Sequence, residues 1–407
     1  MHFRTWYCWL LVVLAGAGLI AAEFWLRHAR PDPSPVGPEV LWTFETPQAG
    51  SIISSPWVDG ERIYVGVIRD AGLSPQGAVY ALDRTTGKAV WSFDDEGEMQ
   101  HMYSSPRVWG NRLFIGEGMH ANVKCKLYCL DERNGTKEWS FPVDGHIEST
   151  PVIADGKVIF GAGDDGLWAV DSARGNRIWR YGQEIHVDST VAVSGQRVFA
   201  GSGVSRRFNN PGVFCVGLAD GHEIWNVPTD LPAWGSPLVT GGRLYIGLGH
   251  GRLDRSLESP AGAVLCLNAE TGQRLWRREL PDAVMTQPVP AGDWIVVNCR
   301  DGACYALSRD DGRIVWKRPL GSALVTNPVL KDGRLYVVAS DGIVAALDPE
   351  SGAEVWRFNV AEHARAKVLL FSSPAVVTEA DGGHVLYFGA ELETPGGRVA
   401  NLYALRE

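Results

Sequence analysis

One repeated pattern constrains the fold of this chain more than any other feature: a turn that ends in Gly is followed four residues later by Trp. A strand-like run such as residues 79–83 precedes the turn, and an earlier pair of strands flanks a short turn such as Asp59-Gly60. Units of four short strands that recur every ~40–50 residues are typical of propeller blades. The pattern occurs seven times, at Gly87/Trp91, Gly135/Trp139, Gly175/Trp179, Gly221/Trp225, Gly272/Trp276, Gly312/Trp316 and Gly352/Trp356.

The two ends of the array each carry part of one further unit. Residues 372–405 begin an eighth unit, but the chain ends before its turn and Trp, whereas residues 40–44 resemble a fourth strand without the first three. We expect the N-terminal strand to complete the last blade, because this pairing removes exposed sheet edges. The predicted fold is all-β: an eight-bladed β-propeller of four-stranded antiparallel blades over residues 40–407.

The residues before the propeller predict export. Residues 6–22 form an uncharged, mostly apolar run with Trp residues near both ends, which favours a retained transmembrane helix within residues 1–30. A signal peptide cleaved after Ala22 is the alternative. The Pro-rich residues 31–39 predict a semi-rigid linker. The propeller is therefore expected in the periplasm or outside the cell, either anchored in the cytoplasmic membrane or secreted.

Charge and motifs exclude several classes of function. The 38 Lys and Arg residues against 47 Asp and Glu residues give a net charge of -9, which argues against nucleic acid as a partner. The sequence also contains no Gly-x-Ser-x-Gly elbow, His-Glu-x-x-His motif, phosphate loop or Cys-x-x-Cys-His haem site. No catalytic residue is assigned from the sequence.

The segment Ala-Leu-Asp-Arg-Thr-Thr-Gly-Lys-Ala-Val-Trp at residues 81–91 resembles the repeat of the pyrroloquinoline quinone (PQQ) propellers. This family includes quinoprotein dehydrogenases and the non-catalytic assembly protein BamB, and the resemblance extends over residues 40–407. It implies that the repeated Trp docks between neighbouring blades and is structural. The residues concerned are Trp42, Trp91, Trp139, Trp179, Trp225, Trp276, Trp316 and Trp356.

The resemblance implies two functions from different classes. One is a membrane-tethered scaffold that binds protein or peptide partners without a cofactor. The other is a PQQ-dependent alcohol or sugar dehydrogenase with calcium, in which Trp234 would stack on the cofactor and Asp188 and Asn327 would supply oxygen ligands. The adjacent-cysteine pair of many alcohol-oxidising members is absent, and little of the chain lies outside blades and loops. The scaffold is therefore the preferred interpretation.

Loop lengths predict which face carries function. In an antiparallel blade the loops between the second and third strands share one face with the crossovers to the next blade, and these loops vary most, with insertions at 68–77, 117–124, 202–212, 248–262 and 390–397. Rigid scaffolds place recognition on such loops. Arg and aromatic residues there suit a partner-binding site, although ordinary solvated charge is the alternative. The candidates are Arg206, Arg207, Phe208, Arg252 and Arg255.

Three consecutive crossovers carry His at the same repeat position. Because alternate residues of an extended chain face the same way, acidic residues two positions on should point with these His residues toward the ring axis. Imidazole and carboxylate groups are ligands of divalent metals, and a hydrated polar rim is the alternative. The candidate metal ligands are His101, His146, His186, Glu148 and Asp188.

The cysteines predict one disulfide at most. Cys129, Cys215 and Cys266 occupy a repeat position that is Ala81 in the first blade, as small buried residues would. A two-residue turn at Asp301-Gly302 would instead place Cys299 opposite Cys304, close enough for a cross-strand disulfide in an exported protein.

Overall fold

The computed structural model describes residues 37–70, 76–120, 122–250, 255–395 and 397–407. The predicted anchor or signal segment and residues 31–36 of the predicted Pro-rich linker lie outside these residues. None of the helices within the described ranges is long and apolar enough to cross a membrane. Residues 38–407 form one compact unit.

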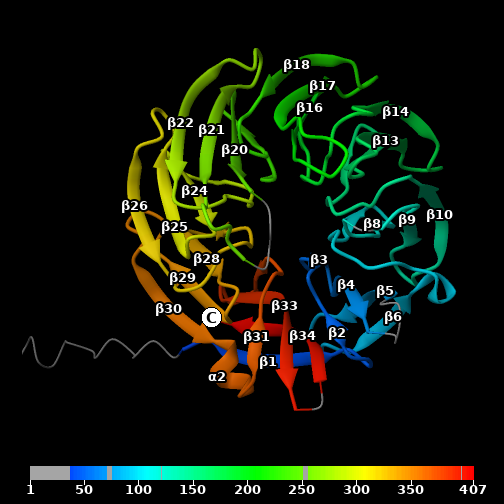
Figure 1. Cartoon of the computed structure of the whole chain (residues 1–407). Coiled ribbons are helices and arrows are strands. Elements are labelled where there is room, and N and C mark those ends of the chain that lie inside the picture. Colours follow the sequence, from blue (N-terminus) through cyan, green and yellow to red (C-terminus); the bar gives the residue numbers. More distant parts are fainter. Residues whose placement is uncertain (1–36, 71–75, 121, 251–254, 396) are drawn as a thin grey trace, which may run out of the picture. The chain divides into compact units, whose positions relative to one another are not determined.

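Eight antiparallel sheets follow one another around a ring (Figure 1). In the first four blades the chain runs through the strands in order, and a short 3-10 helix η1 (Asp95–Gly97) follows the first blade. Blade 1 contains β2 (Gly50–Ser51), β3 (Trp57–Asp59), β4 (Arg62–Arg69), β5 (Gln76–Asp83) and β6 (Ala89–Phe93). Blade 2 contains β7 (Arg107–Trp109), β8 (Arg112–Gly116), β9 (Lys126–Asp131) and β10 (Lys137–Pro142). Blade 3 contains β11 (Val152–Ala154), β12 (Lys157–Gly161), β13 (Leu167–Asp171) and β14 (Arg177–Tyr181), and blade 4 contains β15 (Ala192–Ser194), β16 (Arg197–Ser202), β17 (Gly212–Gly217) and β18 (Glu223–Pro228).

The second half of the ring repeats this order up to its last blade. Blade 5 contains β19 (Leu238–Thr240), β20 (Arg243–Gly249), β21 (Gly262–Asn268) and β22 (Arg274–Leu280). Blade 6 contains β23 (Val289–Ala291), β24 (Trp294–Cys299), β25 (Ala303–Ser308) and β26 (Ile314–Pro319). Blade 7 contains β27 (Val329–Lys331), β28 (Arg334–Val338), β29 (Ile343–Leu347) and β30 (Glu354–Asn359). Blade 8 contains β31 (Lys367–Leu369), β32 (Ala375–Thr378), β33 (His384–Thr394), β34 (Gly397–Arg406) and the N-terminal β1 (Glu39–Glu45).

Strand β1 closes the ring as the sequence predicts. It pairs antiparallel with β34, with Thr43 opposite Tyr403 and Trp42 opposite Ala404. The first propeller strand is therefore the outermost strand of the last blade, at the bottom of the ring in Figure 1. This pairing satisfies the outer edge of β34, which would otherwise be open.

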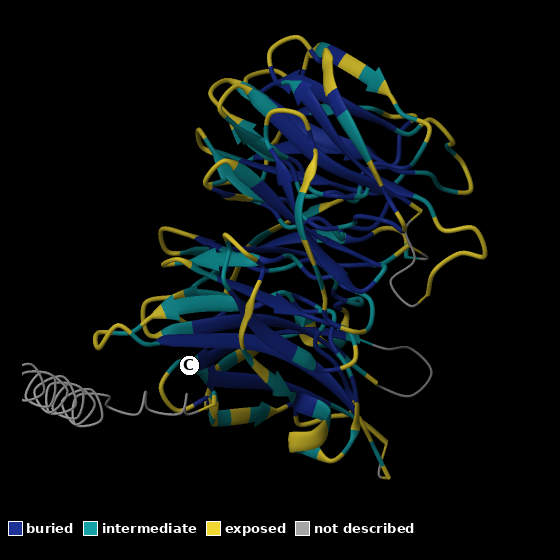
Figure 2. Cartoon of the chain, turned by 90° about the vertical axis from the view of Figure 1, so that its left-hand side faces the viewer, coloured by how far each residue is buried: buried dark blue, intermediate teal, exposed yellow. Residues whose placement is uncertain are grey.

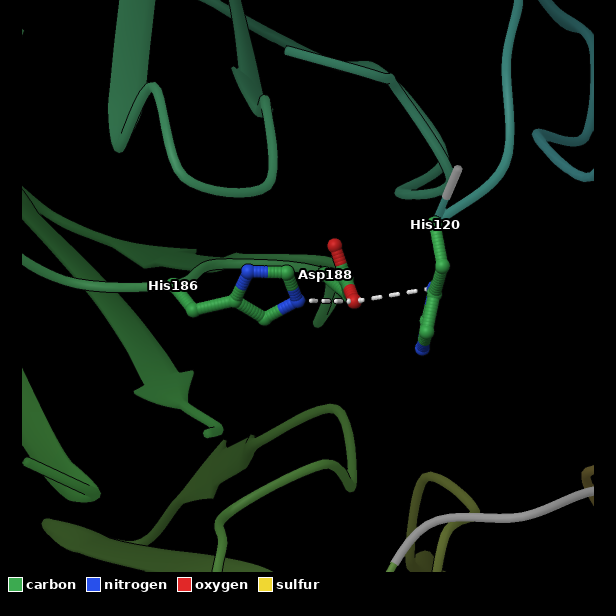
Figure 3. Close-up of side chains that lie close together, drawn as sticks. All are labelled: His120, His186 and Asp188. Carbon is green, nitrogen blue, oxygen red and sulfur yellow. Dashed lines mark hydrogen bonds and ion pairs between the residues drawn. The ribbon is translucent and has the colours of Figure 1, made fainter. Parts of the chain in front are cut away.

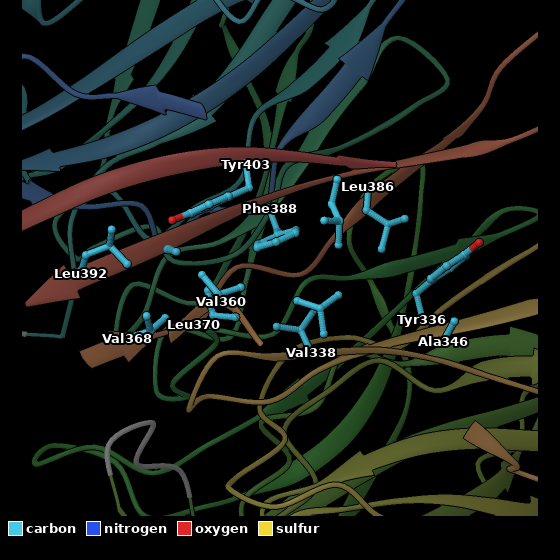
Figure 4. Close-up of a cluster of buried hydrophobic side chains, with 13 residues drawn as sticks. Tyr336, Val338, Ala346, Val360, Val368, Leu370, Leu386, Phe388, Leu392 and Tyr403 are labelled. Atoms are coloured by element: carbon cyan, nitrogen blue, oxygen red, sulfur yellow. The ribbon is translucent and has the colours of Figure 1, made fainter. Parts of the chain in front are cut away.

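The hydrophobic core is divided among the interfaces between blades. Each of eight buried apolar clusters draws its residues from two neighbouring blades. Figure 4 shows the cluster between blades 7 and 8, in which Tyr336 and Val338 face Leu386, Phe388 and Tyr403. Figure 2 shows that buried residues lie mainly in the strands, whereas exposed residues lie mainly in the loops. A blade therefore cannot bury both of its faces without its neighbours.

The repeated Trp residues lie at these interfaces. Trp42 packs on the turn Gly87 of the next blade, where an added Cβ would lie 2.5 Å from the indole ring, and Gly87 has a φ of +68°. Glycine meets both requirements at this position. Seven Trp residues make this contact with Gly87, Gly135, Gly175, Gly221, Gly272, Gly312 and Gly352, and six indoles also donate to a backbone carbonyl of the next blade, those of Trp42, Trp91, Trp179, Trp225, Trp276 and Trp316.

Two parts of the last blades differ from the expected pattern. A short helix α2 (Val360–Ala364) leads into blade 8, and β31 adds a further strand to that blade; neither element is predicted from the sequence. The expected insertion at 390–397 is largely strand, because β33 and β34 continue as one long hairpin to the pair Thr394 and Gly397. The hairpin extends because β31 pairs with its far end, Lys367 lying opposite Glu393.

Candidate functional site

Three imidazoles converge on the loop face of blades 2 to 4. His146 and His186 lie on the crossovers that lead into blades 3 and 4, and their side chains are 5% and 4% exposed. His120 comes from the loop between β8 and β9, and its side chain is 54% exposed. An isolated antiparallel β-bridge between His186 and Gly203 holds the crossover backbone in place. Figure 3 shows His120 and His186 on either side of Asp188.

Asp188 lies at the centre of this cluster. Its Oδ1 is 3.0 Å from Nε2 of His146, and its Oδ2 is 2.7 Å from Nε2 of His186 and 3.7 Å from Nδ1 of His120. Glu148 Oε1 is 2.6 Å from Nδ1 of His120 and also accepts the backbone N–H of His120 at 2.9 Å. Five side chains from two crossovers and one loop thus form a continuous polar network, which we call the histidine–carboxylate cluster.

Imidazole and carboxylate groups in the histidine–carboxylate cluster favour each other's charged forms. The contact with Glu148 raises the pKa of His120 to about 9, although partial burial opposes this shift. Burial disfavours the imidazolium of His186, but Asp188 and Asp164 outweigh burial and raise the pKa of His186. Burial likewise disfavours the Asp188 carboxylate, but His186 and His146 outweigh it and lower the pKa of Asp188. The cluster therefore holds charged groups in a largely buried position.

Aromatic and glycine residues enclose the cluster. The Trp234 ring stacks on His120 with 5.8 Å between centroids, and it meets His186 edge-on at 5.4 Å. Gly163 has a φ of +54°, and a Cβ there would lie 2.5 Å from the His146 ring. The close approach of the imidazole thus requires glycine at this position.

A cavity of about 840 Å³ opens above the cluster. Its lining includes His120, His146 and His186 and also Arg206 and Arg207 from the loop between β16 and β17. The structure therefore brings together two sets of residues that the sequence suggested as separate sites. Arg206 and Arg207 are exposed, and within the described residues neither guanidinium has an ion-pair partner. The Arg207 guanidinium lies 5.3 Å from the ring centroid of Phe208.

Of the predicted residues that the structure describes, four line the cavity: His146, His186, Arg206 and Arg207. Glu148 and Asp188 lie in the histidine–carboxylate cluster, and Phe208 lies beside Arg207. His101 is not a member of the cluster. Its Nδ1 is buried and has no hydrogen-bond partner among the described residues, and burial lowers its pKa. Its place is taken by His120, which the repeat register did not reveal because it lies on an insertion. Arg255 is exposed and is not among the lining residues, and Arg252 lies outside the described residues.

The candidate PQQ and calcium residues each have other partners in the fold. The Asn327 side-chain oxygen accepts the backbone N–H of Gln287 at 2.7 Å. This bond is one of a series in which a backbone N–H donates to the equivalent side chain of the next blade, as in Thr150 to Thr190 and Ser373 to Ser55. Asp188 is surrounded by imidazoles, whereas calcium prefers oxygen ligands. One face of Trp234 already carries His120. With these contacts, Trp234, Asp188 and Asn327 do not fit a PQQ and calcium site.

The expected disulfide is wrong in register. The turn after β24 contains three residues, 300–302, so that Cys299 pairs with Ala303 and Cys304 pairs with Asn298. Neighbouring strand positions face opposite sides of a sheet. Cys299 consequently belongs to the interface of blades 5 and 6, and Cys304 to that of blades 6 and 7. Both thiols are free and buried.

Alkylation of the cysteines is expected to be slow in the native protein and complete after denaturation without reductant. Burial raises the pKa of Cys299 to about 12 and that of Cys215 to about 11, so little thiolate forms in the folded state. Mass spectrometry of peptides after iodoacetamide treatment in urea would detect the labels, with Cys215 as the internal control. Unlabelled Cys299 and Cys304 beside labelled Cys215 would contradict the structure.

Comparison with solved structures supports the fold. BamB from Moraxella catarrhalis aligns with 90% of this chain and 97% of its own at 16% identity, with a TM-score of 0.62. Quinohemoprotein alcohol dehydrogenase from Comamonas testosteroni aligns with 91% of this chain and 76% of its own at 11% identity and a TM-score of 0.66. A europium-containing methanol dehydrogenase aligns with 91% and 93%, at 13% identity and a TM-score of 0.65. At these identities the likeness concerns the fold alone.

One comparison with curated proteins concerns a shorter segment. Tetrathionate hydrolase from Acidithiobacillus ferrooxidans is 28% identical over 129 residues, which is 30% of this chain. The match spans only 23% of the length of that relative.

The family itself is established by a longer match. The family model described as outer membrane protein assembly factor BamB matches residues 37–119, 77–253 and 260–405, which together include most of the propeller. Dehydrogenases share the propeller, so the match does not separate a scaffold from an enzyme. With its eight blades and its repeat, the chain belongs to this BamB-like family of PQQ-type propellers.

Proposed function

We propose that this chain is a non-catalytic propeller scaffold that binds a protein or peptide partner on its loop face. An acidic group of the partner enters the cavity above the histidine–carboxylate cluster. The observation that carries this proposal is the pair Arg206 and Arg207: two exposed guanidiniums without ion pairs among the described residues, beside a cavity, in a chain of net charge -9. Unpaired Arg at a concave site is typical of binding hot spots.

Location forms part of the proposal. The apolar residues 6–22 suit a membrane anchor, which would tether the propeller at the outer surface of the cytoplasmic membrane, in the periplasm or outside the cell. Cleavage after Ala22 would release the same propeller in secreted form. Membership of a family described as an assembly factor agrees with a protein-binding role.

The dehydrogenase alternative has weaker support. It rests on structural neighbours that share the fold at 11–13% identity. Trp234, Asp188 and Asn327, which would hold PQQ and calcium, are committed to contacts with other residues. We therefore assign no cofactor chemistry to the chain under this proposal.

Changing both Arg206 and Arg207 to Ser is expected to weaken partner capture at least ~10-fold, since loss of a hot-spot contact costs more than about 1.4 kcal/mol. The matched control changes Arg174 and Arg313 to Ser. Both residues are exposed and lie in turns of the opposite face, and their substitution removes the same charge. Cross-linking and affinity capture from solubilised membranes would compare the three proteins. Equal capture by all three, or dye reduction by the wild-type protein with PQQ, calcium and an alcohol or sugar, would overturn the scaffold proposal.

A further inference from the structure

We propose that His120, His146, His186 and Asp188 bind one divalent transition-metal ion of the zinc class, with Glu148 as a fifth donor. This site does not depend on the scaffold function. It combines two groups that share His120: His120, His186 and Asp188, and His120, His146 and Glu148. Within each group the donor atoms lie within 4.8 Å of one another, and the residues come from two crossovers and one loop.

The separations between carboxylate oxygens and imidazole nitrogens are close to those between ligands of one metal ion. Ligands 2.0–2.2 Å from a tetrahedral zinc ion lie about 3.3–3.6 Å from one another. In the cluster, the carboxylate oxygens of Asp188 lie 2.7 Å, 3.0 Å and 3.7 Å from nitrogens of His186, His146 and His120. Oε1 of Glu148 lies 2.6 Å from Nδ1 of His120 and 3.9 Å from Nε2 of His146. These carboxylate–imidazole separations bracket the expected spacing. Binding of one ion would bring the two groups of donors together by side-chain rotation around the shared His120.

The surroundings of His186 carry a second sign of a metal site. Its Nδ1 lies 2.7 Å from Oδ1 of Asp164, while its Nε2 faces the cluster. Metal-binding imidazoles commonly donate their remote N–H to a carboxylate, which fixes the ring and leaves the other nitrogen free to bind the ion. Asp164 would thus be a positioning residue that does not touch the metal.

Burial gives the site a fixed inner side and an open outer side. The side chains of His146, His186 and Asp188 are 4–7% exposed, so the fold holds them in place before an ion arrives. His120 is 54% exposed and borders the cavity that also contains Arg206 and Arg207. An ion can therefore enter from the cavity, and an anionic group in the cavity would be next to it.

The donor set determines which metals fit. Imidazole nitrogens suit zinc, copper and nickel, whereas magnesium and calcium require mainly oxygen ligands. Three of the five donors here are imidazoles. We therefore expect Zn²⁺ to bind in the presence of excess Mg²⁺ or Ca²⁺.

Isothermal titration of the chelator-treated full chain in detergent with ZnCl₂ tests the proposal, with no partner protein present. The wild-type protein should bind one Zn²⁺ per chain. His120→Ala, at a half-exposed position that leaves folding intact, should weaken binding at least ~10–100-fold, and Asp164→Asn should weaken it by a similar factor through His186. The control His222→Ala removes a 64% exposed His that also contacts a carboxylate, Asp220 at 2.6 Å, and should change nothing.

Crystals soaked in zinc provide the second readout. An anomalous peak is expected about 2.0–2.2 Å from the ring nitrogens of the cluster. The Arg206 and Arg207 double variant should retain the metal, so failure of the scaffold proposal and failure of the metal proposal remain distinct. Absence of the peak, equal Zn²⁺ affinity of the wild-type protein and His120→Ala, or an equal loss of affinity in His222→Ala would overturn the metal site.

Discussion

Removal of residues 1–45 is expected to prevent formation of a stable propeller, whereas removal of residues 1–36 should leave it folded. The longer deletion takes away β1, and with it six residue pairs with β34. It also removes the Trp42 indole that packs on Gly87 and donates to the carbonyl of Arg84 at 3.1 Å. Truncation of a fully buried Trp costs about 3–5 kcal/mol, and loss of the half-buried Trp42 adds part of this cost to the lost strand pairing. The open edge of β34 would also favour aggregation.

Two measurements compare these truncated proteins. Size-exclusion chromatography should show a monomer for the protein that begins at residue 37 and aggregates for the protein that begins at residue 46. Thermal unfolding followed by circular dichroism should show a cooperative transition in the first protein only. If both proteins elute as monomers with the same unfolding midpoint, closure by β1 contributes nothing to stability.

Trp225→Ala is expected to lower the free energy of unfolding by about 3–5 kcal/mol. The Trp225 side chain is 9% exposed, packs on Gly272, lies 5.9 Å from Phe199 between ring centroids and donates to the carbonyl of Ala269. The substitution leaves a cavity between blades 4 and 5 and an unsatisfied carbonyl. Urea unfolding followed by fluorescence would measure the change.

Two further comparisons test whether stability depends on docking of the repeated Trp between blades, and not on the presence of any Trp side chain. Trp109→Ala, at a residue that is 64% exposed, should change stability by less than about 0.5 kcal/mol. Trp139→Phe should cost less than Trp225→Phe, because the Trp139 indole nitrogen has no hydrogen-bond partner in the part of the chain that the structure describes, whereas that of Trp225 has one. A similar loss for Trp109→Ala and Trp225→Ala would contradict the structural role of the repeated Trp.

Features that repeat were predictable from the sequence. The Gly–Trp spacing indicates the blades, and the unmatched segments at residues 40–44 and 372–405 indicate how the ring closes, because an unpaired strand at each end has one natural partner. The pairing of β1 with β34 confirms this closure. A repeated sequence predicts a repeated structure because each blade packs both of its faces against neighbouring blades through equivalent residues.

Features that do not repeat were not predictable in the same way. His101 shares the register of His146 and His186, but the cluster uses His120 from an insertion whose path no periodicity defines. A useful signal was available: the insertion at 117–124 contains a His and lies next to the crossover of His146. The Cys299 register failed for a related reason, since a turn of three residues in place of two moves every later side chain to the opposite face.

The pairing of β1 with β34 has a consequence for biosynthesis. The first segment of the propeller to be synthesised needs a partner that is the last to be synthesised, and Ser373 donates to Ser55 across the same junction, 318 residues apart in sequence. Blades 1 to 7 can assemble in order as the chain emerges, but the exposed edge persists until the final strand arrives. A chain truncated before β34 would therefore keep an incomplete blade 8 with unpaired strand edges, which favour association with other chains.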